Sequence, residues 1–195
     1  MSDEQKDKLI DTLQDWKTNH YEELIKSGQV ETRPGVLRLM DEARAAGLKV
    51  AVCSAATKSA AVTTVSSLLG EKRWNALDCF LAGNDVAKLK VRRAAMLASC
   101  CALTRRLQPD PLIYNTACAK LGLKASECIV IEDSTVGLKA ATAAGMRCII
   151  TYTSTGKGEP FAEAAFVVNN LDVGGVTVQK LLETHASNSR FDDRK

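Results

Sequence analysis

Short apolar runs alternate along this chain with segments of helical periodicity, and this alternation is its strongest structural constraint. The clearest runs are KVAVC and CIVI, whose continuous apolar character is typical of strands buried on both faces. Strands separated by helices of about ten residues indicate βα units and a parallel sheet. The sequence therefore predicts an α/β fold with a doubly wound, Rossmann-like sheet.

The expected elements follow from the periodicity and from the positions of glycine. Helices are predicted over 3–26, 36–46, 59–69, 112–121, 136–144 and 176–184, and strands over 49–53, 79–82, 128–131, 147–152 and 165–168. Glycines directly follow several of these helices, as expected for C-terminal caps. After Thr184 the chain is polar, and we expect a disordered tail.

The net charge of +3 depends on one segment of the chain. Val91–Gln108 carries four arginines and no acidic residue, so the chain without it has a net charge of −1. The composition of this segment favours a helix. A basic helix of this kind either binds an anionic membrane or nucleic acid or is solvated, and we prefer the solvated helix. With a solvated helix we expect neither a membrane nor a nucleic-acid partner. No apolar run approaches the roughly 18–20 residues of a membrane span, so we do not expect an integral membrane protein.

The cysteine pattern argues against a zinc site. The seven cysteines form no C-x-x-C pair, and the two histidines, His20 and His185, lie far apart in the sequence. Cys53, Cys128 and Cys148 lie within or beside apolar strand-like runs, where a free cysteine behaves as a small buried hydrophobe. We therefore expect reduced cysteines and a reducing compartment.

In a doubly wound sheet, binding groups lie at the carboxyl ends of the strands. The run CIVI leads directly into Glu132, Asp133 and Ser134. Adjacent carboxylates at the end of a buried strand repel each other, and Mg²⁺ with oxygen ligands is the simplest compensating ion. The alternative is that Asp133 or Ser134 caps the next helix while Glu132 is solvated.

Ser54 follows the strand 49–53 and is a candidate phosphate ligand. Its hydroxyl could donate to a phosphate oxygen, with the N–H groups of Ala55 and Ala56 as further donors. An ST-turn or helix N-cap is the simpler alternative for this serine. Lys88 and Lys90 could neutralise a phosphate, although a lone lysine is usually solvated surface.

The order of these motifs resembles the haloacid dehalogenase (HAD) superfamily of phosphohydrolases. The stretches RPGVLRLMDEARAAGLKVAVCSAATK, KLK with PDPLIYNTACAKLGL, and IVIEDSTVGLKAATAAGM carry its second, third and fourth motifs. The similarity covers Glu22–Leu171 and is greatest to CbbY-like sugar-phosphate phosphatases and plastid HAD-like hydrolases of plants.

The resemblance implies roles for individual residues. Ser54 would hydrogen-bond the transferring phosphoryl group with the amide of Ala55, and Lys90 would stabilise its negative charge. Asp133, with Glu132, would hold Mg²⁺. The implied substrate is a phosphorylated sugar, such as xylulose-1,5-bisphosphate, and the implied location is the plastid stroma, or otherwise the cytoplasm. The sequence indicates no oligomeric state.

Two departures from the family stand out, and the first is the nucleophile motif. Family members begin with a strand ending in D-x-D-x-[TV], and no D-x-D occurs in this chain. That strand would lie between the strands 49–53 and 128–131. We interpret 1–32 as a remnant of a helical cap, 33–184 as the HAD-like core and 185–195 as the tail. The polypeptide as given is therefore expected to be inactive, and a non-catalytic HAD-like binding or regulatory protein is the alternative.

The second departure is Val91–Gln108, which separates KLK from PDP where the family has a continuous Lys-Pro-x-Pro motif. Excising the segment restores KLKPDPLIY, so we interpret it as a retained intron or a gene-model error. If the segment is present, it moves Lys90 away from the proline turn that would position it.

Overall fold

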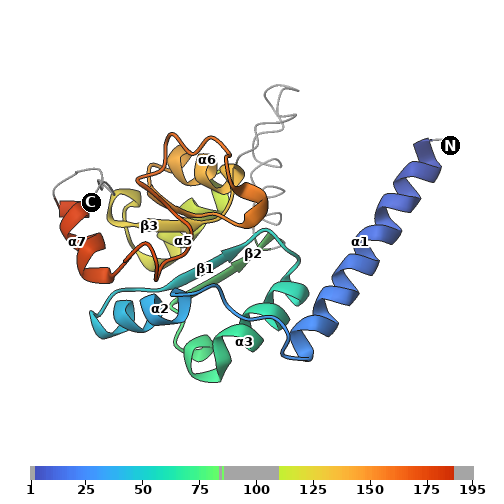
Figure 1. Ribbon diagram of the computed structural model, residues 1–195, viewed down its shortest axis with the longest axis horizontal. Helices are drawn as coiled ribbons and strands as arrows, with labels where there is room; N and C mark the ends of the chain where they lie inside the picture. The colour runs from blue at the N-terminus through green and yellow to red at the C-terminus, as the bar shows by residue number, and fades with distance from the viewer. Residues whose placement is uncertain (1–2, 84, 86–109, 187–195) are drawn as a thin grey trace.

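The computed structural model describes residues 3–83, 85 and 110–186, and its body has parallel strands between two layers of helices (Figure 1). The helices are α1 (Asp3–Lys26), α2 (Val36–Ala45), α3 (Lys58–Asn75), α5 (Leu112–Leu121), α6 (Thr135–Ala143) and α7 (Val178–Ala186). The strands are β1 (Ala51–Ser54), β2 (Cys79–Ala82), β3 (Ile129–Glu132), β4 (Arg147–Thr151) and β5 (Phe166–Val168). Two short 3₁₀ turns, at Ala125–Glu127 and Ser154–Gly156, were not predicted.

The predicted helices and strands are all present, and their ends differ in two informative places. The predicted end at Leu69 coincides with a break inside α3, because Gly70 has non-helical angles (φ +73°, ψ 161°), and a second helical segment then continues to Asn75. The last helix begins two residues later than predicted, since the Thr177 hydroxyl accepts the Lys180 N–H at 3.2 Å and caps the helix at that point. The expected tail beyond residue 186 lies outside the described residues.

The strands form two parallel sheets instead of one. β1 pairs with β2, with Ala51 opposite Cys79, while β3, β4 and β5 form a separate sheet in that order. Within the described part of the chain, β1 and β3 each have one edge without a partner strand. The family resemblance places the absent D-x-D strand between these same two strands.

Alternating side chains of β4 separate the core into two layers. Ile149 packs with α2, β5 and α7 in a cluster that includes Leu39 and Leu181. Cys148 and Ile150, on the opposite face, pack with α5 and α6. The three-stranded sheet is thus covered by helices on both faces, which confirms the predicted α/β class.

Helix α5 contacts both sheets. Ala117 packs against Cys79 and Leu81 of β2. Tyr114 and Cys118, on the same helix, belong to the core cluster that covers β4. Because no strand–strand hydrogen bond joins the two sheets, α5 supplies packing that holds them together.

Helix α1 extends away from the body (Figure 1). Ile25, near its end, is buried, whereas Leu9, Leu13 and Trp16 are 47%, 55% and 64% exposed. These apolar side chains are therefore not covered by the body of the described structure. None of the described helices combines the length and apolar character required to cross a membrane.

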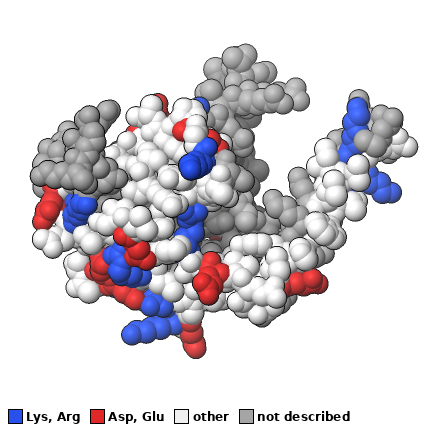
Figure 2. All heavy atoms as spheres, in the orientation of Figure 1, with Lys and Arg blue, Asp and Glu red and all other residues white. Residues whose placement is uncertain are grey.

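Arg38 of α2 fixes the loop that leads into α7. Its guanidinium donates to Asp172 Oδ1 at 2.8 Å and to the Val176 carbonyl at 2.9 Å, and it also pairs with Glu42. Glu42 in turn accepts the Val178 N–H at 3.0 Å. Figure 2 shows basic and acidic side chains interspersed over this part of the surface.

Gly35, which precedes α2, is predicted to tolerate no side chain. Its φ is +87°, and a Cβ there would lie 2.7 Å from Leu171 Cβ. Gly35→Ala should lower the free energy of unfolding by about 3 kcal/mol, combining left-handed backbone strain with a steric overlap. Urea denaturation measures the loss.

Gly122→Ala is the matched control, because its φ is +66° and a Cβ would meet no atom within 4 Å. In the control, the free energy of unfolding should fall only by the backbone contribution of about 1 kcal/mol. Equal losses in the two variants would contradict the steric argument.

Candidate functional site at the carboxyl ends of the strands

Strands β1 and β3, each with one edge that lacks a partner strand among the described residues, carry the predicted site residues at their carboxyl ends. Ser54 is the last residue of β1 and Glu132 is the last residue of β3. Cys53 packs against the core cluster that also contacts Val130, so the two strands lie close together. Burial raises the pKa of Cys53 to about 12, and the nearby Glu132 carboxylate contributes to that shift.

Ser54 forms the short turn that was the simpler alternative at this position. Its Oγ accepts the Ala56 N–H at 3.2 Å, and α3 begins four residues further on, at Lys58. Ala55 is exposed. The turn therefore presents a hydroxyl and a backbone segment at the edge of the sheet.

Gly83, which follows β2, holds this turn in place. Its N–H donates to the Ala56 carbonyl at 3.0 Å, and a Cβ at this position would lie 2.6 Å from the Ala55 carbonyl oxygen. Only glycine permits so close an approach of the two loops. The β1 and β2 ends thus form one unit.

An ion pair lies beside the same unit. Lys58 Nζ is 2.9 Å from Asp85 Oδ1, and Asp85 also accepts the Ala82 N–H at 3.1 Å. The Lys58 ammonium and this N–H hold the pKa of the Asp85 carboxyl below its ordinary value. Asp85 is therefore a charged, structurally engaged carboxylate.

The Glu132 carboxylate is enclosed by α5 and by the start of α6. The Tyr114 hydroxyl donates to Glu132 Oε1, and the backbone N–H of Asp133 hydrogen-bonds the same carboxylate. A Cβ on Gly137 would lie 2.0 Å from Oε2. Burial raises the pKa of Glu132, and the adjacent Asp133 charge adds to the shift.

Asp133 and Ser134 have different environments from Glu132. Asp133 is exposed. Ser134 is the N-cap of α6, since its Oγ accepts the Gly137 N–H at 3.1 Å. The helix cap considered from sequence is thus made by Ser134, which leaves the Asp133 side chain outside this cap.

The predicted lysines cannot be placed in this arrangement, because Lys88 and Lys90 lie outside the described residues. Of the five predicted site residues, the four that the structure describes, Ser54, Ala55, Glu132 and Asp133, lie at or directly after the carboxyl ends of β1 and β3.

Sequence reasoning missed Tyr114 and Gly137. Tyr114 is 8% exposed and lies on an otherwise apolar helix face with Ala117 and Cys118. A buried tyrosine hydroxyl normally requires a hydrogen-bonding partner, and this requirement was the available signal. The partner itself lies 18 residues away in the sequence.

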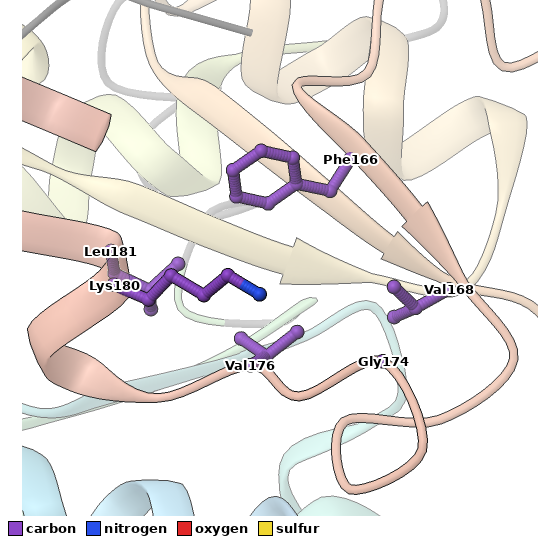
Figure 3. Close-up of a pocket in the computed structure, with 6 residues that line it drawn as sticks. All are labelled: Phe166, Val168, Gly174, Val176, Lys180 and Leu181. Carbon is purple, nitrogen blue, oxygen red and sulfur yellow. The ribbon is translucent and has the colours of Figure 1, made fainter. Parts of the chain in front are cut away.

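A small pocket elsewhere does not compete with this site. Figure 3 shows its lining residues, which come from β5, the loop after it and α7, with the Lys180 side chain extending along it. Its volume of about 10 Å³ is at most that of one water molecule. Phe166 and Val168 belong to the core cluster, so this pocket is a packing defect.

Comparison with known proteins gives consistent matches. The sequence profile of haloacid dehalogenase-like hydrolases matches residues 2–145. A haloacid dehalogenase-like hydrolase domain-containing protein of Arabidopsis thaliana is 50% identical over 184 residues, which are 94% of this chain and 52% of that protein. The chloroplastic protein SUPPRESSOR OF QUENCHING 1 of Arabidopsis thaliana is 29% identical over 157 residues, 80% of this chain and 13% of that protein.

Among solved structures, a variant of CbbY from Rhodobacter sphaeroides in complex with xylulose-1,5-bisphosphate has a TM-score of 0.65 and 25% identity. The alignment covers 83% of this chain and 64% of that one. This chain thus spans about half the length of the first Arabidopsis relative and less than two thirds of CbbY.

The motif order read from the sequence, the parallel sheets and the family profile agree, and the profile covers most of the described core. The resemblance inferred from the motifs is confirmed. The chain belongs to the haloacid dehalogenase-like hydrolase family.

Proposed function

We propose that this chain forms the phosphate- and metal-binding part of a Mg²⁺-dependent phosphatase that acts on a phosphorylated sugar. The observation that carries the proposal is that the strands ending in Ser54 and Glu132 pack against one core cluster, with the Glu132 charge near Cys53, the neighbour of Ser54. The bound xylulose-1,5-bisphosphate named for the CbbY structure supports a sugar bisphosphate as substrate.

Ser54 is the proposed phosphate donor. The bond from the Ala56 N–H uses a lone pair of Oγ, so the hydroxyl hydrogen can be donated to a phosphoryl oxygen. The Ala55 N–H would supply a second donor from the same turn. Because Gly83 fixes the turn, these donors need little reorganisation when phosphate binds.

Asp133 and Glu132 are the proposed Mg²⁺ ligands. The described residues contain no group of three or more metal-ligating side chains, but Mg²⁺ is commonly held by one or two carboxylates together with phosphate oxygens. Exposed Asp133 fits this role directly, while Glu132 adds a second carboxylate anchored by Tyr114. When bound, Mg²⁺ would neutralise phosphoryl charge.

The remaining roles concern residues that the structure does not describe. Lys90 is proposed to stabilise the negative charge of the phosphoryl group. The attacking aspartate of the family has no counterpart here, because no D-x-D occurs in the 195 residues. We therefore expect hydrolysis only when a strand bearing D-x-D-x-[TV] accompanies this chain. By resemblance to plant relatives, one of them named as chloroplastic, we propose the plastid stroma as its location.

The decisive experiment compares this chain with the same chain preceded by a D-x-D-x-[TV] strand. Phosphate release from xylulose-1,5-bisphosphate should be at least about a thousandfold faster with the strand, because the strand supplies the nucleophile. Chelation of Mg²⁺ should abolish the gain. Equal release from the two proteins would contradict the assignment, and tight sugar-phosphate binding without release from either would favour a non-catalytic binding protein.

Metal binding can be measured without activity, by Mn²⁺-induced broadening of amide NMR signals. Broadening should centre on residues 132–134, and Asp133→Asn should weaken Mn²⁺ binding about tenfold or more. Asp41→Asn is the control, since Asp41 is an exposed carboxylate paired with Arg73 in another part of the fold. Unchanged Mn²⁺ affinity in Asp133→Asn would remove this residue from the metal site.

Tyr114→Phe tests the anchoring of Glu132. The substitution keeps the buried ring but removes the donor to a half-buried carboxylate, so the free energy of unfolding should fall by about 1–3 kcal/mol. Tyr152→Phe, in the same core cluster, is the control and should cost less. Urea denaturation of both variants gives the comparison, and equal losses would contradict the anchoring role.

A further inference from the structure

Two cysteines outside the proposed site lie in contact. Cys118 of α5 and Cys128, directly before β3, have their Sγ atoms 3.4 Å apart. Cys128 also donates to the Lys124 carbonyl at 3.4 Å. Cys118 is 8% exposed, whereas Cys128 is only half-buried.

The position of the pair follows from how α5 packs on β3. Tyr114, in the first turn of α5, contacts Glu132 at the carboxyl end of β3. Cys118, one turn later, contacts Cys128 at the opposite end of the same strand. The helix therefore runs antiparallel to the strand and touches it at both ends, so a link at one end fixes the register at the other.

We propose that Cys118 and Cys128 form a reversible disulfide when the protein meets a low-molecular-weight disulfide oxidant. A disulfide requires the sulfurs to move from 3.4 Å to roughly 2.05 Å, a shift that side-chain rotation can supply. The other cysteines in the described part of the chain, Cys53, Cys79 and Cys148, show no such sulfur–sulfur contact.

The reaction is thiol–disulfide exchange in two steps. The more exposed Cys128 loses its proton and attacks one sulfur of the oxidant, which forms a mixed disulfide and releases one thiol. Cys118 then loses its proton and attacks Cys128 Sγ, which releases the second thiol. Two protein thiols are oxidised, and the oxidant disulfide is reduced to two thiols that take up the protons.

The environment of the two cysteines slows the first step of this reaction and favours the second. Burial and the contact with Cys118 raise the pKa of Cys128 to about 12, so little thiolate is present near neutral pH. Once the mixed disulfide has formed, the second sulfur is already in contact and ring closure is favoured over release. The crosslink would hold α5 in the register in which Tyr114 meets Glu132.

The test is to incubate the reduced protein with glutathione disulfide for several hours at pH 8, both folded and in guanidinium. After alkylation and trypsin digestion, mass spectrometry should find peptides 107–120 and 125–139 joined in the folded sample. These peptides are otherwise separate, because Lys120 and Lys124 lie between them. The fraction of joined peptide should be about fivefold higher in the folded sample than in the guanidinium sample. The disulfide should also raise the melting temperature of the folded protein by about 5 °C.

Cys148→Ala is the matched control, since it removes a cysteine of the same core cluster and keeps the pair. It should retain the joined peptides, whereas Cys118→Ala and Cys128→Ala should each lose them. Equal pairing in folded and denatured samples, or a dominant link to any other of the seven cysteines, would overturn the proposal.

Discussion

The packing of α5 across two sheets is the interaction on which the rest of this structure depends. In the described part of the chain no strand–strand hydrogen bond joins β1–β2 to β3–β4–β5, so the two sheets depend on packing by helices and on contacts between loops. Ala117 contacts β2, while Tyr114 and Cys118 contact the cluster on β4. Each large buried side chain contributes roughly 1.5–3 kcal/mol, so a few contacts on one helix are enough to matter against the marginal stability of a domain.

This dependence extends to the candidate site, because its two halves come from different sheets. Ser54 ends β1 and Glu132 ends β3, and the structure gives them no shared backbone hydrogen bond. Tyr114 bonds Glu132 from the same helix that packs against β2. A helix that holds the core together thus also sets the separation of the two groups proposed to bind phosphate and metal.

Much of the fold could be predicted from local sequence, whereas the site could be predicted only in part. The apolar runs and the helix-ending glycines locate the elements because these signals act within a few residues; Gly122, for instance, has the left-handed φ expected after α5. The Tyr114–Glu132 hydrogen bond and the fit of Gly137 against Glu132 depend on how α5 and α6 pack against β3, so no local sequence pattern predicts them. Gly70 likewise breaks the helix directly after Leu69, and what the local pattern did not predict is the second helical segment that continues to Asn75.

The charges at this edge of the fold also explain why a phosphate would need further cations. Glu132, Asp133 and Asp85 lie at or directly after the ends of β3 and β2, and Lys58 is already paired with Asp85. A phosphate dianion approaching Ser54 would therefore meet an excess of negative charge, which opposes its binding. A divalent cation at Asp133 would offset this excess of negative charge, and a second positive group would add to the effect. The Mg²⁺ and Lys90 roles proposed here therefore belong together, because the described residues alone leave the phosphate charge uncompensated.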